Sequence, residues 1–254
     1  VHTSMALAVL SGVLLGALLL LLSAPLLELM GCPENVLAGA KLYLNIYAVG
    51  LPASFIYNYG AAILRAVGDT KRPLYYLTIS GVANIILNVL LVAGLKLSVA
   101  GVAIATAIAY TVSAATLFIR LLKTDSVVRV TPRDLAIDPV ALKRIVKIGL
   151  PAGIQSAVFA VANIIIQSAI NSLGTEVMAA SSAAMSLEYV CYNLLNSFSQ
   201  ACTTFVGQNH GARQIDRCTK TLKVCLVEGG IVALTTIIVI VGLGREISVS
   251  YTHL

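Results

Sequence analysis

Two asparagines and a threonine are the polar side chains most able to do chemistry within the apolar part of the sequence. Asn84 and Asn88, in "VANIILNVLLV", lie four residues apart and so share one face of a helix. Thr106, in "AIATAIAY", belongs to the next apolar run, and the chain turns near 96–99. At about 1.5 Å of rise per residue, Asn88 and Thr106 reach a similar depth on either side of that turn. Their oxygens can form part of a hard-cation site, or they can only hydrogen-bond the two helices together.

One acid, Glu188 in "AAMSLEYVCYN", lies near the middle of another apolar run. An ionised carboxylate is costly in hydrocarbon, so we expect Glu188 to be neutral, paired or facing water. It is a candidate for a proton relay, and the alternative is a hydrogen-bonded interior acid. Glu228 is expected within a turn or two of a helix start, from which its stem can reach the membrane interface.

A further run carries a stripe of amide side chains. Spacings of 8, 4 and 4 residues place them near one line along a helix; they are Gln155, Asn163, Gln167 and Asn171. Such a stripe lines a polar cavity for a substrate or packs against a neighbouring helix, and the spacing is compatible with both interpretations.

Long apolar helices must position these side chains. Of 254 residues, 58% are hydrophobic and 11% are charged, whereas a soluble domain carries about 25% charged residues. The composition therefore predicts lipid as the solvent. A spanning helix needs about 20 apolar residues, and the stretches that qualify are 5–28, 42–66, 73–95, 98–122, 147–172, 177–206 and 222–243. Because open strands cannot satisfy their backbone in lipid, the sequence predicts an all-α polytopic membrane protein with seven spans.

Lysine and arginine set the orientation of these spans. All but three of the 17 fall in alternate connections, at 64–73, 120–147 and 207–223. Such connections face the cytoplasm, so the first helix is predicted to run outward. The net charge of +6 does not indicate nucleic acid, because Trp is absent and the basic residues form short clusters without stacking aromatic rings.

The connections carry their own signals. The polar stretch 123–146 is predicted to be a cytoplasmic connector between two helical bundles, with Pro139 opening a short in-plane helix near 139–147. In "LRAVGDTKRP", Gly68 falls where a left-handed residue ends a helix, and Asp69 and Thr70 can cap the next one. A capped hairpin is expected there, because a phosphate-binding loop needs more glycines and follows a strand.

Enzymatic chemistry finds little support in the sequence. The three histidines, His2, His210 and His253, lie outside the spans, and no HExxH or GxSxG motif occurs. The five cysteines lack metal-site spacing and are predicted to be free thiols; they are Cys32, Cys191, Cys202, Cys218 and Cys225. We therefore predict no enzyme, no catalytic residue, no cofactor and no metal beyond a coupling cation.

Five stretches between about 40 and 243 together resemble the multidrug and toxic compound extrusion (MATE) family of transporters. The G-D-T-K-x-P turn, the spaced asparagines and the G-Q-N-x-G-A turn are specific in combination. The stretches are "GLPASFIYNYGAAILRAVGDTKRP", "ANIILNVLLVAG", "GVAIATAIAY", "GLPAGIQSAVFAVANIIIQSAINSLGTE" and "NSFSQACTTFVGQNHGAR". The resemblance implies a twelve-helix transporter of two lobes, with 1–122 supplying helices three to six and 147–254 supplying helices seven to nine.

The same resemblance implies a function. It implies export of drugs and toxic organic compounds in exchange for Na⁺ or H⁺, by alternating access, from a bacterial inner membrane and as a monomer when complete. Asn84, Asn88 and Thr106 match the family's first-lobe cation site in order and spacing. The acid that one branch carries in helix seven is not evident, since Gln155 and Phe159 stand in that stretch.

Two other functions stay open. A lipid-linked sugar flippase of the related superfamily is expected to have a more cationic cavity, whereas no Lys or Arg lies deep in the spans predicted here. A non-transporting membrane scaffold is disfavoured by the mid-span polar residues. The chain begins with Val, and the final "SVSYTHL" looks like translated cloning or adapter sequence, so a fragment is expected whose helix-one aspartate precedes Val1.

Overall fold

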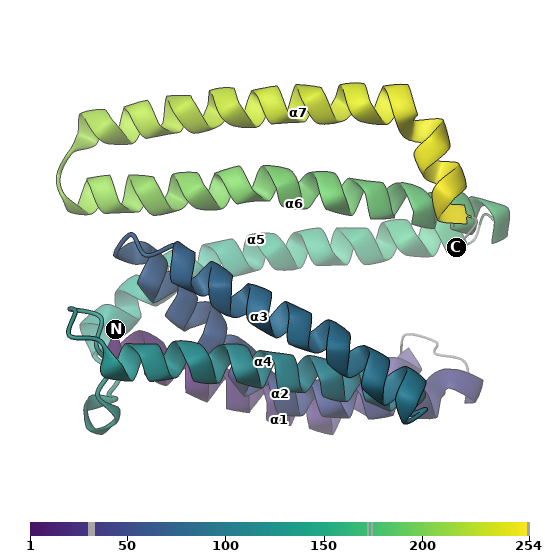
Figure 1. The fold of residues 1–254 in the computed structure, drawn as a ribbon, viewed down its shortest axis with the longest axis horizontal. Helices are drawn as coiled ribbons and strands as arrows, with labels where there is room; N and C mark the ends of the chain where they lie inside the picture. The colour runs from purple at the N-terminus through teal and green to yellow at the C-terminus, as the bar shows by residue number, and fades with distance from the viewer. Residues whose placement is uncertain (30–33, 172, 174, 253–254) are drawn as a thin grey trace. The chain divides into compact units, whose positions relative to one another are not determined.

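A computed structural model describes residues 1–29, 34–171, 173 and 175–252, and these are helical almost throughout (Figure 1). The chain divides into two compact units, Val1–Val146 and Lys147–Leu254. Cys32 and His253 lie outside the described residues, so the predictions for them are not addressed.

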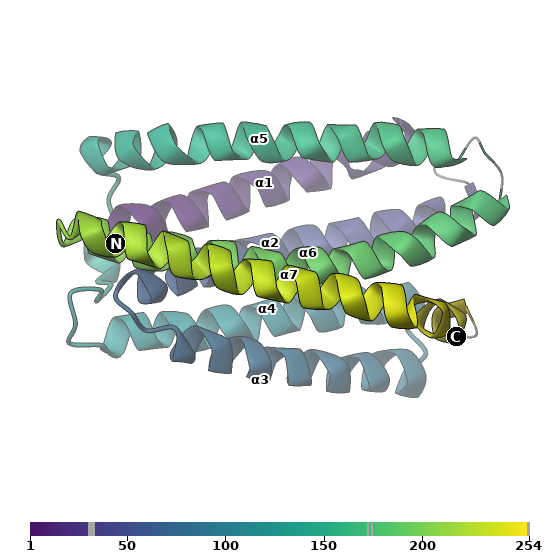
Figure 2. The same ribbon diagram turned by 90° about the horizontal axis from the view of Figure 1, so that it is seen from above.

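The first unit is built from four long helices. They are α1 (His2–Leu29), α2 (Glu34–Ala66), α3 (Lys71–Asn88) and α4 (Ser98–Lys123), with a π-helix η1 (Val89–Gly94) after α3 and a 3₁₀ turn η2 (Pro132–Asp134) in the connector. α2 packs against α1 on one side and α4 on the other, and α3 lies along α4 (Figures 1 and 2). α4 therefore provides most of the packing between α3 and the rest of the unit.

Small residues let these helices approach closely. A Cβ added to Gly12 of α1 would lie 2.7 Å from the Pro52 Cα of α2, and one added to Gly16 would lie 2.8 Å from the Ala48 carbonyl oxygen. Lipid tails are as apolar as the helices, so helix association depends on close backbone packing of this kind rather than on a hydrophobic drive.

The largest buried cluster lies where α1, α2, α4 and the connector meet. Its members are Met5, Tyr57, Ala61, Leu64, Ala114, Leu117, Leu121, Val128 and Val130. The hydroxyl of Tyr57 also donates a hydrogen bond to the Pro73 carbonyl oxygen, at 2.9 Å. This bond ties α2 to the first turn of α3 across the basic hairpin.

The second unit contains most of α5 (Pro139–Asn171), together with α6 (Thr175–Gly211) and α7 (Ile215–Thr252). α6 and α7 pack along one another as a hairpin. The separate in-plane helix expected near 139–147 is wrong. Pro139 does open a helix, but Asp138 caps it and nothing interrupts the helix before Asn171, so the segment is the first part of α5.

The seven predicted spans coincide with the seven long helices of the described residues, which extend up to nine residues beyond the predicted ends. The extensions consist largely of polar residues that can remain helical outside hydrocarbon. By length and hydropathy, the described residues contain five helices able to cross a membrane: His2–Glu28, Lys71–Gly94, Ser98–Lys123, Pro139–Ile170 and Ile215–Gly242. α2 and α6 are long enough but are not among these five.

The hairpin between α2 and α3 has the predicted geometry in part. Gly68 takes a φ of +87°, the left-handed conformation expected of the residue that ends a helix. Asp69, rather than Thr70, supplies the cap: its Oδ1 accepts from the Arg72 N–H at 3.2 Å, and its Oδ2 pairs with the Arg72 guanidinium at 2.8 Å. The turn is thus a capped hairpin.

Replacing Gly68 by alanine should destabilise the first unit, because a Cβ in the left-handed conformation costs about 1–2 kcal/mol. Thermal unfolding in detergent checks this. Gly81→Ala is the matched control: Gly81 lies inside α3 with nothing within 4 Å of an added Cβ, so alanine there should be neutral or stabilising. Equal stability of Gly68→Ala and the parent protein would contradict the strained turn.

Candidate functional site

Asn84 and Asn88 form a hydrogen-bonded pair on α3. The Asn88 side-chain amide donates to both the Asn84 carbonyl oxygen and the Asn84 Oδ1, each at 3.0 Å. The four-residue spacing of the sequence is what brings the two amides together on one face. Asn88 uses its side-chain N–H group in this pair, and its Oδ1 is left as an acceptor that does not bond to Asn84.

That oxygen has no partner. Asn88 Oδ1 is buried, and no hydrogen-bond donor reaches it among the residues that the structure describes. An unsatisfied buried acceptor costs about 1–3 kcal/mol, so an atom of this kind calls for a ligand or a further polar group. A hard cation, which takes amide and hydroxyl oxygens as ligands, fits the donor set.

A π-helix begins at the residue after Asn88. η1 covers Val89–Gly94, and the wider turn continues through the bonds from Leu95 N–H to the Leu90 carbonyl and from Leu97 N–H to the Leu91 carbonyl. π-Helical turns occur frequently at functional sites. The apolar run 73–95 predicted an ordinary helix throughout, which is wrong for Val89–Gly94.

Thr106 lies on α4, the helix that packs along α3. Its hydroxyl donates to the Val102 carbonyl oxygen of its own helix at 2.9 Å, which leaves oxygen lone pairs available as ligands. Near the start of α4, an added Cβ on Gly101 would lie 3.2 Å from both Leu91 and Val92 of η1. Gly101 therefore sets how closely α4 approaches the segment that follows Asn88.

The other predicted site residues lie in the second unit. Glu188 is exposed on α6, as are Gln155 and Asn163 on α5, and Gln167 is partly buried. Among the described residues, α5 has no extended packing against another helix. The structure thus leaves the relay role of Glu188 and the cavity role of the amide stripe as predictions.

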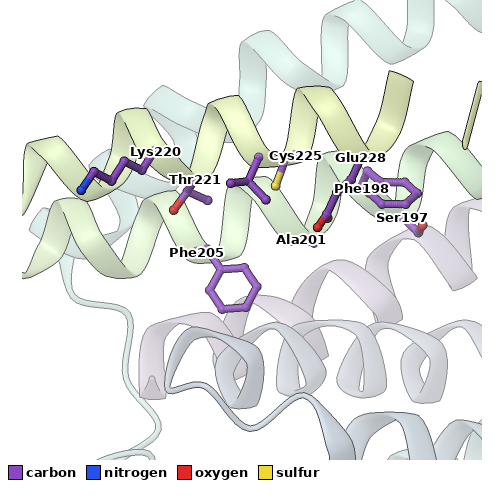
Figure 3. A pocket seen from close by; sticks show the side chains of 9 residues that line it. Ser197, Phe198, Ala201, Phe205, Lys220, Thr221, Cys225 and Glu228 are labelled. Atoms are coloured by element: carbon purple, nitrogen blue, oxygen red, sulfur yellow. The ribbon is translucent and has the colours of Figure 1, made fainter. Parts of the chain in front are cut away.

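A hollow of about 450 Å³ lies on the α6–α7 hairpin (Figure 3), lined by Ser197, Phe198, Ala201, Phe205, Lys220, Thr221, Val224, Cys225 and Glu228.

The expectation that Glu228 lies within two turns of a helix start is wrong. α7 begins at Ile215, earlier than predicted, so Glu228 is more than three turns into the helix. The first residues of α7 are polar, so the hydropathy of the sequence placed the start of this helix too late.

Three side-chain contacts of the first unit were not predicted from the sequence. Tyr47 of α2 packs edge-on against Tyr110 of α4, with ring centroids 6.3 Å apart, and stacks on Tyr43 at the same distance. The hydroxyl of Ser23 donates to Asn45 Oδ1 at 2.9 Å, which links α1 to α2. The spacing of Tyr43 and Tyr47 at four residues was the available signal.

The cysteines of the second unit agree with the sequence analysis. Cys191, Cys202, Cys218 and Cys225 are free thiols. No cluster of three or more His, Cys, Asp or Glu side chains suited to a metal ion occurs in the described part of the chain.

Comparison with known proteins identifies relatives. The MatE family model matches residues 1–90 and 151–253. The probable multidrug resistance protein YoeA of Bacillus subtilis is 30% identical over 234 residues, covering 88% of this chain and 50% of YoeA. An FAD transporter of Shewanella oneidensis is 27% identical over 206 residues, covering 80% of this chain and 46% of that protein. The chain spans about half the length of these curated relatives.

Solved structures share the fold. The outward-facing conformation of a multidrug resistance MATE family transporter of the MOP superfamily matches with a TM-score of 0.88 at 22% identity, over 96% of this chain and 55% of that chain. The match confirms the all-α membrane fold expected from the sequence.

Gly101→Val should disturb the contact that sets α3 against α4. The added methyl groups meet η1 at van der Waals limits, and overpacking of this kind costs about 1–3 kcal/mol. Amide exchange of 89–97 should rise together with a lower unfolding temperature in detergent. Gly81→Val carries the same change into open space. If both variants behave alike, the close approach does not hold η1 in place.

Proposed function

The chain belongs to the MatE family, and from this premise we propose that it is part of a transporter that exports drugs and toxic organic compounds by alternating access. The chain would supply helices three to nine of twelve, with 1–122 in one lobe, 123–146 as the cytoplasmic connector and 147–254 in the other lobe. The predicted partners are small-molecule substrates and the lipid bilayer, and Na⁺ or H⁺ is the predicted coupling ion.

The observation that carries this proposal is the unpartnered Oδ1 of Asn88. It is buried beside Asn84 on α3, and α4 with Thr106 packs along the same helix. Polar groups within a membrane are costly, so those that face a bundle interior mark ion or substrate pathways. Asn84, Asn88 and Thr106 are therefore the proposed ligands of the coupling cation in the first lobe.

The chemistry of this trio bears on which ion it can bind. Amides and hydroxyls do not take up protons near neutral pH, whereas their oxygens coordinate hard metal cations. The trio is suited to Na⁺, and a neutral site of this kind gains affinity from any carboxylate that approaches it. Coupling through H⁺ would need an acid, and Glu188 on α6 is the proposed relay.

Coupling requires that each ligand distinguishes between two states of the transporter. A ligand that binds the outward-open and inward-open states equally shifts neither. We propose that cation binding at Asn88 favours the state that releases the drug, and that the stripe of Gln155, Asn163 and Gln167 lines the substrate cavity. Cation binding then lowers the affinity for the drug, and drug binding lowers the affinity for the cation by the same factor.

A second substrate class is favoured by one relative. The Shewanella protein is an FAD transporter, so a relative of this chain carries a large anionic molecule. A lipid-linked sugar flippase is the more distant alternative. Uptake of a fluorescent organic cation into proteoliposomes under an imposed Na⁺ or H⁺ gradient separates these possibilities, because neither a flavin carrier nor a flippase should accumulate the dye.

Asn88→Ala in the complete transporter should weaken cation-driven efflux. Loss of one neutral ligand to a charged ion is worth roughly 1.5 kcal/mol, so the Na⁺ concentration for half-maximal efflux should rise about tenfold. Thr106→Ala should act in the same direction. Thr111→Ala is the matched control, because Thr111 makes the same backbone bond on α4, to Ala107 at 2.8 Å. Unchanged cation dependence in both site variants would remove the assignment.

Glu188→Gln tests the proposed proton relay. The substitution keeps the shape of the side chain but cannot carry a proton, so the dependence of efflux on pH should flatten. Glu228→Gln on α7 is the comparison and should keep the parent profile. An unaltered profile in Glu188→Gln would reduce Glu188 to a structural acid.

A further inference from the structure

The connector after α4 is docked on the first unit rather than hanging free. Val128 and Val130 are 5% and 1% exposed, and they join the buried cluster beside Met5, Leu117 and Leu121. The Val130 N–H donates to the Leu121 carbonyl oxygen at 3.0 Å. This part of the connector is therefore held by the last turn of α4.

The next residues of the connector bind the start of α1. The Thr131 N–H donates to His2 Nε2 at 3.1 Å. Thr3 is 6% exposed, and its hydroxyl accepts from the Asp138 N–H at 3.1 Å and donates to the Ala136 carbonyl oxygen at 3.3 Å. The Thr3 hydroxyl thus both donates to and accepts from the connector, whose residues lie more than 130 positions away in the sequence.

Asp138 then joins this contact to α5. Its Oδ1 accepts from the N–H groups of Val140 and Ala141, at 2.7 and 3.1 Å, which caps the first turn of α5. The backbone of Asp138 is bound to α1, and its side chain is bound to α5. A displacement of α1 relative to α5 must strain or break one of these bonds.

The connector also links α5 to the helix that carries Thr106. α4 holds Thr106 in its middle and Leu121 near its end, and Leu121 holds Val130. Continuous contacts therefore run from α4 through the connector to the start of α5. All of these residues belong to the first unit. Beyond Val146, the same α5 helix continues without interruption into the second unit.

We propose that Thr3 and Asp138 are positioning residues of the transport cycle, which make the connector a rigid strap that carries movement of α1 and α4 to the start of α5. This inference rests on the proposed transport function and names how one lobe's helices act on α5. A flexible tether would let α4 move without displacing α5, because a loose loop transmits no force.

The test compares Thr3→Val with Thr3→Ser in the complete transporter. Valine keeps the shape of threonine but removes both hydrogen bonds, whereas serine keeps them. Amide exchange at Ala136–Asp138 should rise roughly tenfold in Thr3→Val, and the initial rate of gradient-driven efflux should fall at least about fivefold. Thr3→Ser should restore both. Na⁺ binding should stay within about twofold of the parent, because Thr3 is not a ligand of the proposed cation site.

Several results would overturn the inference. Faster exchange with unchanged efflux in Thr3→Val would make the docking merely structural, and unchanged exchange would show that Thr3 does not hold the connector. A matching loss in Ser4→Ala, which removes the neighbouring hydroxyl of α1, would show a general effect of this helix end. If the parent protein exports nothing under any gradient, the proposed function itself fails, and the Thr3 variants play no part in that result.

Discussion

Hydrocarbon offers peptide N–H and C=O groups no hydrogen-bond partner, so every spanning segment must satisfy its backbone internally. The long helices follow from this constraint, and it reaches the side chains as well. Thr106 and Thr111 of α4 donate their hydroxyls to carbonyl oxygens of the preceding turn, and Tyr57 donates to the Pro73 carbonyl oxygen in a buried hydrogen bond at the first turn of α3. Asn88 Oδ1 is the departure from this pattern, and the unsatisfied atom is the reason to place a cation there.

The features around Asn88 serve the same site. The π-turns of η1 begin at Val89, and Gly101 allows α4 to lie against that segment. From α4, the contacts continue through Leu121 and Val130 to the connector. Under the proposed cation site, a ligand held by Asn88 and Thr106 would act on α4, the helix that also fixes the connector. Coupling of cation binding to drug transport requires two things. These contacts would transmit the movement, and a different affinity of each ligand for the two states would drive it.

Hydropathy and charge were sufficient to predict the seven helices and the all-α membrane fold, because both signals are local and strong in a chain with 11% charged residues. The pairing of Asn84 with Asn88 also followed from a four-residue spacing. The π-helix after Asn88 did not, since it depends on a shift in hydrogen-bond register that residue types do not encode. The early start of α7 was missed because helix continues through polar residues once the chain leaves lipid.

The connector shows the same limit. Its composition predicted a polar tether. Residues 123–146 all belong to the first compact unit, Val1–Val146, and the tether role stays a prediction. Val128 and Val130 were visible as two apolar residues in a polar stretch, but nothing local indicated that they would be buried against Met5. Contacts between residues more than 120 positions apart, such as those of Thr3 with Ala136, are fixed by how the helices pack and only then become visible.

The most direct test of the account is equilibrium binding of radioactive sodium to the purified complete transporter, at constant ionic strength. The account predicts a saturable component that has the same affinity in the parent protein and in Thr111→Ala and is about tenfold weaker in Asn88→Ala. Saturable binding of equal affinity in Asn88→Ala would contradict it, because the buried oxygen of Asn88 would then have no part in holding the cation.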